Sequence, residues 1–115
     1  MPTPDRRDLI NQFKDRKVSA GIFAVRNLGT GARWLGVTQN LGSQQNGTFF
    51  ELRTGSHRNG PLQAAWKAEG AEAFVYEVVE AVDVEGLVPY QRGQRLKERL
   101  NHWLASDPKA QPIVA

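Results

Sequence analysis

The fold is decided by residues 20–63, AGIFAVRNLGTGARWLGVTQNLGSQQNGTFFELRTGSHRNGPLQ. Residues 19–27 and 33–38 are short segments in which β-branched and aromatic side chains favour strands. A turn-rich segment with two glycines, residues 28–31, separates them. Two strands joined by a glycine-containing loop of this length form a hairpin. The sequence therefore predicts an antiparallel strand pair at the start of a sheet.

The second half of the same stretch predicts two helices. In residues 41–54, Leu41, Thr48, Phe49 and Leu52 recur on one side, and Gly55 is placed to end the helix. Pro61 is suited to the first turn of a second helix over residues 62–69, which Gly70 closes.

Outside this stretch the chain predicts one more strand and two more helices. Residues 74–79, FVYEVV, have the strongest strand composition in the chain. Residues 91–105 predict a final helix with a buried stripe of Leu96, Leu100, Trp103 and Leu104. The expected organisation is an N-terminal helix over residues 1–17, a domain over 18–108 and a flexible tail over 109–115. The predicted fold class is an α/β sandwich with a three-stranded antiparallel sheet flanked by helices.

Composition fits one small soluble domain and excludes several classes of site. The chain has 115 residues, with 40% hydrophobic and 23% charged side chains, and no apolar run that predicts a membrane span or a secretory signal. A cytoplasmic protein is expected. The absence of cysteine excludes disulfides and thiolate sites. The net charge of +3 and a pI of about 9.6 agree with either a nucleic-acid binder or an ordinary basic surface.

The order of short motifs along the chain resembles the GIY-YIG nuclease family. Two tripeptides, Gly21-Ile22-Phe23 and Trp34-Leu35-Gly36, stand with ten residues between them. They are followed by Asn40-Leu41, then Gly55-Ser56-His57-Arg58-Asn59, then Leu62-Gln63. Further matches are Trp66, Gly70, Phe74, Glu77, Glu80 and the pair Trp103-Leu104. The resemblance covers residues 18–108 and implies the same sandwich architecture that periodicity predicts.

The resemblance implies hydrolysis of phosphodiesters with one divalent metal, such as Mg²⁺. Family members use two tyrosine hydroxyls at the water, a helix arginine on the phosphate and a late-helix glutamate on the metal. Carried onto this chain, these four positions are Phe23, Trp34, Gln44 and Leu100, none of which has the required group. No cofactor is therefore expected, unless substitute groups keep a Mg²⁺-dependent nuclease working. Trp34 is interpreted as a plug of the vacated pocket, with a base-stacking platform as the alternative.

Basic residues suggest where nucleic acid would bind. Around the start of the second predicted helix the candidates are Arg53, His57, Arg58, Asn59 and Lys67, because free backbone N–H groups there attract anions. On the final helix the candidates are Arg92, Arg95 and Arg99, which could contact phosphates, although such a stripe is more often a solvated helix flank. His57 is either a phosphate contact or proton shuttle near the active face, or a loop histidine with no such role.

Three functions remain open at this point. The first is a catalytically degenerate GIY-YIG-like domain that binds the phosphate backbone of DNA or RNA weakly. The second is an active divalent-metal-dependent DNA endonuclease that uses substitute groups. The third is a protein-interaction or structural module on the same scaffold. The positions of the basic residues separate the first from the third, and a carboxylate on the Phe23–Trp34 surface would favour the second.

Overall fold

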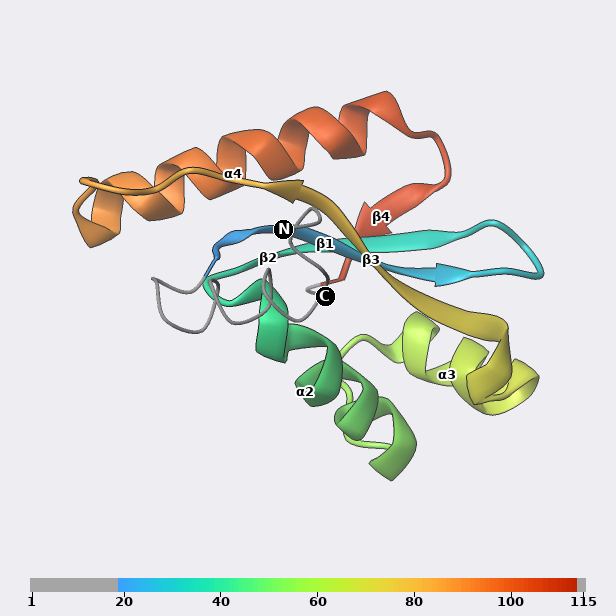
Figure 1. Cartoon of the computed structure of the whole chain (residues 1–115). Coiled ribbons are helices and arrows are strands. Elements are labelled where there is room, and N and C mark those ends of the chain that lie inside the picture. The colour runs from blue at the N-terminus through green and yellow to red at the C-terminus, as the bar shows by residue number, and fades with distance from the viewer. Residues whose placement is uncertain (1–18, 114–115) are drawn as a thin grey trace, which may run out of the picture.

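The computed structural model describes residues 19–113, and the helix predicted for residues 1–17 lies outside this range. A sheet forms the middle layer, with helices on both faces (Figure 1). Along the chain the elements are β1 (Gly21–Asn27), β2 (Arg33–Thr38), α2 (Leu41–Thr54), α3 (Gly60–Glu69), the 3₁₀ turn η1 (Ala71–Ala73), β3 (Phe74–Ala81), α4 (Pro89–Ser106) and β4 (Ala110–Pro112).

Three strands pair as predicted. β1 is antiparallel to both β2 and β3, with Phe23 opposite Gly36 in one pair and Ala24 opposite Glu77 in the other. Ile22 and Leu35 are both buried, at 0% and 1% exposed. The antiparallel hairpin and its partner strand are therefore confirmed.

A fourth strand was not predicted. β4 pairs with β2 in parallel, which gives a mixed sheet of order β3-β1-β2-β4. The expected flexible tail is wrong for residues 110–113, since Ile113 is 6% exposed and its N–H donates to Leu35 O at 2.8 Å. A strand of three residues has no alternating pattern to detect, and Pro112 is tolerated because β4 lies at the sheet edge.

The helices cover opposite faces of the sheet. Figure 1 shows α2 and α3 on one side and α4 on the other. Gly55 ends α2 with a left-handed φ of 78°, as its position after the apolar stripe predicted. Among residues 19–113, no helix is long and apolar enough to cross a membrane.

Strand alternation divides the apolar side chains into two cores. Phe23, Val25 and Trp34 face α2 and α3, where they pack with Leu52, Leu62, Trp66 and Phe74. Ile22, Ala24 and Leu35 face α4, where they pack with Leu96 and the partly buried Leu100, Trp103 and Leu104. The predicted stripe on the last helix is thus confirmed.

Candidate functional site

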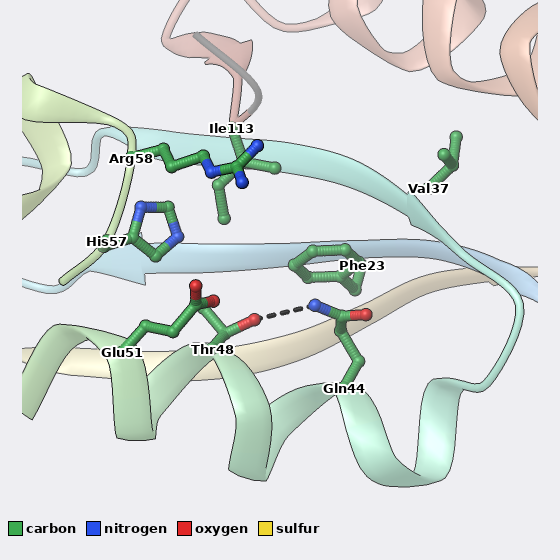
Figure 2. Close-up of a pocket in the computed structure, with 8 residues that line it drawn as sticks. All are labelled: Phe23, Val37, Gln44, Thr48, Glu51, His57, Arg58 and Ile113. Carbon is green, nitrogen blue, oxygen red and sulfur yellow. Dashed lines mark hydrogen bonds between the residues drawn. The ribbon is translucent and has the colours of Figure 1, made fainter.

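A hollow of about 300 Å³ opens on the α2 face of the sheet. Figure 2 shows α2 and the loop after it bordering this pocket, with the C-terminal segment at its far wall. The residues that line it are Phe23, Val37, Gln44, Thr48, Glu51, His57, Arg58 and Ile113. It is the place where the first tripeptide meets the loop that follows α2.

One face of α2 supplies three polar groups to the pocket. Gln44, Thr48 and Glu51 are spaced four and three residues apart, so they lie on the same side of the helix. The Gln44 amide nitrogen donates to Thr48 Oγ1 at 2.8 Å. The Glu51 carboxylate extends from the helix toward the centre of the pocket (Figure 2). Sequence analysis missed Thr48 and Glu51 as site residues, although their helical spacing from Gln44 could have identified them.

The loop between α2 and α3 holds His57 in place from both sides. The His57 backbone N–H donates to Gln63 Oε1 at 3.2 Å, while Gln63 Nε2 donates to Leu52 O at 3.0 Å. The Asn59 backbone N–H donates to His57 Nδ1 at 3.0 Å. The glutamine of the Leu-Gln motif thus holds the backbone of the histidine in the Gly-Ser-His-x-Asn motif.

The hydrogen bond to Nδ1 fixes what His57 can do. A neutral imidazole has one N–H and one acceptor nitrogen, so acceptance at Nδ1 places the proton on Nε2. Burial lowers the pKa of His57, and the nearby Glu51 carboxylate only partly offsets this. Figure 2 shows the other ring nitrogen on the pocket side. This geometry suits a neutral hydrogen-bond donor better than a proton shuttle, which needs a free acceptor at Nε2.

Asn59 serves the loop rather than the pocket. It caps α3, since its Oδ1 accepts from Leu62 N at 3.0 Å, and it is 4% exposed. Its Nδ2 donates to Pro112 O at 3.2 Å and Ile113 O at 3.0 Å. The oxygen and the nitrogen of the Asn59 side-chain amide are therefore both engaged within the domain. This leaves no free side-chain group for the nucleic-acid contact that the sequence predicted.

The four positions implied by the resemblance do not meet in one place. Phe23 and Gln44 line the pocket, and the Phe23 ring stacks on Tyr76 with centroids 5.7 Å apart. Trp34 is 4% exposed and packs against Phe74 in the core, which agrees with a plug and leaves little ring surface for stacking. Leu100 belongs to the hydrophobic cluster on the other face of the sheet.

The basic residues are also divided between faces. Arg58 lines the pocket, and no ion pair among residues 19–113 involves it. Arg53 and Lys67 are exposed outside the lining, and Lys67 lies in the last turn of α3 rather than near its start. The Lys67 amine nevertheless lies near Gly55, because Lys67 Nζ is 3.9 Å from the position that a Cβ atom would take on Gly55.

On α4, two of the three arginines make contacts with the rest of the domain. Arg99 Nε donates to Glu80 Oε1 at 2.8 Å, and Arg95 donates to Asp83 O at 3.2 Å. Hydrogen bonds from Trp103 and then Arg99 lower the pKa of Glu80. Arg92 is partly buried, and its Nε has no partner among the described residues. The arginines of α4 and Arg58 therefore do not converge on one surface.

The start of α3 offers fewer free N–H groups than the sequence suggested. Pro61 has none, Leu62 N is capped by Asn59 Oδ1, and Gln63 N donates to Asn59 O at 2.9 Å. An anion near the start of α3 would therefore be bound mainly by side chains of the loop between α2 and α3.

The residues present do not fit the divalent metal that the resemblance implies. Glu51 is the one carboxylate in the pocket lining, and His57 Nε2 carries a proton. Among residues 19–113 there is no cluster of three or more His, Cys, Asp or Glu side chains able to hold a metal ion. The position of the family glutamate is a leucine in the opposite core.

Two solved structures have a similar fold. The catalytic domain of the homing endonuclease I-TevI aligns over 84% of this chain and 99% of its own length, with a TM-score of 0.67 and 19% identity. A mutant of the catalytic domain of intron endonuclease I-TevI aligns over 77% and 84%, with a TM-score of 0.65 and 20% identity. I-TevI is a GIY-YIG endonuclease.

This chain has a GIY-YIG-like fold. No family model matches its sequence, and no curated protein matches it significantly. At this level of identity the likeness establishes the fold of the GIY-YIG-like domain and nothing of its chemistry.

Proposed function

We propose that this GIY-YIG-like domain binds nucleic acid through backbone phosphates and does not cleave it. The observation that carries the proposal is the composition of the pocket. It combines an arginine and a histidine N–H with the aromatic ring of Phe23, where the family resemblance implies a hydroxyl. The fold likeness to an endonuclease catalytic domain supports nucleic acid as the partner.

The pocket lacks most of the groups that hydrolysis of a phosphodiester requires. The attacking water needs a proton acceptor, and the charge that develops on the phosphate needs a cation held in place. Phe23 has no acceptor, Gln44 has no charge and Leu100 faces the other core. Glu51 is the one carboxylate of the lining and can accept a proton, as an active nuclease would require, but among the described residues no cluster of three or more His, Cys, Asp or Glu side chains is present to hold the cation. Thr48 accepts a hydrogen bond from Gln44 and is 2% exposed, so its hydroxyl is largely closed off from an entering substrate.

Several groups in and around the pocket remain free to contact phosphates. Arg58 is exposed at the edge of the pocket, and a guanidinium can bind a phosphate with two hydrogen bonds. His57 Nε2–H adds a neutral donor beside it. Arg53 and Lys67 would extend the positive surface along α2 and the loop. Such contacts fix position on the backbone but carry no sequence information.

Replacing Arg58 with alanine is expected to weaken binding to single- and double-stranded DNA by roughly fivefold to tenfold at low salt. It should also flatten the log–log salt dependence by about 0.9 on duplex, since one phosphate contact is lost. The measurement is fluorescence anisotropy of labelled oligonucleotides across a potassium chloride series.

The matched control is Lys97→Ala, which removes the same charge from an exposed position on α4, on the opposite face of the sheet. Equal losses in the two variants would mean that net charge alone attracts the DNA. A parent protein that binds no oligonucleotide at low salt would reject the proposal, and the protein-interaction module would then take its place.

A further inference from the structure

A carboxylate in the pocket is unexpected for a site that receives a polyanion. Figure 2 shows Glu51 on the α2 side of the hollow, with His57 and Arg58 across from it. The carboxylate is close enough to His57 to raise the pKa of the imidazole against the effect of burial. Among residues 19–113, no hydrogen bond or ion pair engages the Glu51 side chain.

The opposite charges of Glu51 and Arg58 divide the pocket into two parts. A phosphate would be attracted to Arg58 and repelled by Glu51, so the sugar-phosphate backbone belongs at the Arg58 edge. Whatever lies against Glu51 must instead present hydrogen-bond donors, because a carboxylate only accepts. A nucleotide can satisfy both residues if its base enters the pocket and donates hydrogen bonds to Glu51 while its phosphate stays at the pocket edge beside Arg58.

Among the common bases, guanine satisfies a carboxylate best. Its N1–H and 2-amino group are adjacent donors that can bond both carboxylate oxygens at once. Adenine and cytosine place one amino donor next to an acceptor nitrogen, and uracil and thymine place one N–H between two carbonyl oxygens. Each of these bases would therefore bring an acceptor against the negative charge of Glu51.

The rest of the lining is partly apolar. Phe23 and Ile113 contribute to it, and both are nearly buried, at 2% and 6% exposed, so they bound the hollow rather than offer a stacking platform. Ile113 fills the space above Gly36, where its Cγ2 lies 2.5 Å from an ideal Cβ. The volume of about 300 Å³ is at the lower end of pockets that hold small molecules, which is enough for one purine. The base must be unpaired, because guanine uses the same N1–H and 2-amino group to pair with cytosine.

We propose that the pocket takes one unpaired guanine of a nucleic-acid strand, with its Watson–Crick edge on Glu51 and its phosphate at Arg58. This inference rests on the proposed function, since it names the base that enters the same site. It goes beyond phosphate-backbone binding because it predicts a sequence preference where backbone contacts alone predict none.

The test compares single-stranded oligothymidylates that carry guanine, adenine, cytosine or hypoxanthine at one central position, by fluorescence anisotropy at fixed low salt. The guanine strand is expected to bind about tenfold more tightly than the adenine strand, as a good two-bond base contact provides. Hypoxanthine keeps N1–H and lacks the 2-amino group, so its strand should fall between the two.

Glu51→Gln is the deciding variant. It should reduce the guanine-to-adenine affinity ratio to near one, because an amide offers one acceptor oxygen in place of two. The affinity for the guanine strand should fall, while the affinity for the adenine and cytosine strands should stay equal or rise, since a repelling charge is gone. The matched control is Glu72→Gln, an exposed glutamate in η1 outside the pocket, which should keep the tenfold ratio.

The outcomes separate this inference from the proposed function. Equal affinity of the parent for all four strands, or a guanine preference that survives Glu51→Gln, overturns the guanine site and leaves phosphate binding standing. Absence of binding to any strand rejects both. A last competition uses free guanosine monophosphate against the labelled guanine strand. If the free nucleotide displaces the labelled strand at the same concentration as unlabelled strand does, the guanine need not belong to a strand, and that part of the proposal is overturned. If at least a hundredfold more free nucleotide is needed, a strand is supported as its source.

Discussion

Replacing Asn59 with alanine is expected to lower the free energy of unfolding by roughly 3 kcal/mol. Loss of the α3 cap accounts for about 1 kcal/mol of this. The remaining loss of stability comes from the carbonyl oxygens of Pro112 and Ile113. In the parent protein both accept hydrogen bonds from Asn59 Nδ2, which hold the C-terminal segment in place. A buried carbonyl left without a partner costs about 1–3 kcal/mol. Thermal and urea unfolding would measure the change.

The control for this variant is Asn40→Ala at the start of α2. Asn40 also caps a helix, since its Oδ1 accepts from Ser43 N at 3.2 Å, but it makes no contact comparable to that of Asn59 with the last strand. We therefore expect a loss of only about 1 kcal/mol. If the two alanine variants were equally destabilised, the clamp on the C-terminal strand would contribute nothing.

A second large effect is expected from Gly21→Ala, at the glycine of the first tripeptide. An ideal Cβ at this position would lie 2.2 Å from Glu80 O and 2.8 Å from Leu41 Cδ1. Glu80 O belongs to the backbone of β3, which is paired with β1, so it cannot move aside without breaking the sheet. Overpacking of this kind costs typically 1–3 kcal/mol and occasionally more, and we expect the upper end, about 3 kcal/mol.

For a domain of this size that loss corresponds to a fall in the melting temperature of roughly 10–20 °C. Gly47→Ala is the matched control, because an ideal Cβ at Gly47 meets nothing within 4 Å and the residue lies inside α2. That variant should be stabilised by up to about 1 kcal/mol. A Gly21→Ala protein as stable as the parent would show that the close approach of β1 and β3 is not required.

Most of the sheet could be predicted from the sequence because its signals are local. The hairpin has its turn residues between two short segments with β-branched and aromatic side chains, and β3 has a run of such side chains. β4 could not be predicted in the same way. Its three residues have no periodicity, and Ile113 is buried because Gly36, far away in the sequence, leaves space beneath it.

The candidate site was predicted only where the motifs pointed to it. Phe23, Gln44, His57 and Arg58 were expected from the resemblance or from charge, and all four line the pocket. Leu100 was expected beside them from the resemblance, and the arginines of α4 were a separate binding candidate whose position was left open. The amphipathic pattern of a helix shows which of its sides is buried but not which face of the sheet it covers, and α4 covers the face away from the pocket.

The role of Glu51 also lay beyond the motifs. Its spacing from Gln44 places it on the pocket side of α2, yet nothing in the sequence says that the loop after α2 folds back to bring His57 and Arg58 opposite it. That arrangement depends on the hydrogen bonds of Gln63 and Asn59, which join residues on either side of the loop.

The central claim is that the pocket binds nucleic acid without cleaving it. Its most direct test is incubation of the nuclease-free protein with end-labelled single- and double-stranded DNA, with Mg²⁺ or Mn²⁺, followed by native and denaturing gels of the same samples. We predict a salt-sensitive shift on the native gel and intact strands on the denaturing gel. Metal-dependent cleavage by the parent that disappears in Glu51→Gln or His57→Ala would contradict the account and favour an active nuclease built on substitute groups.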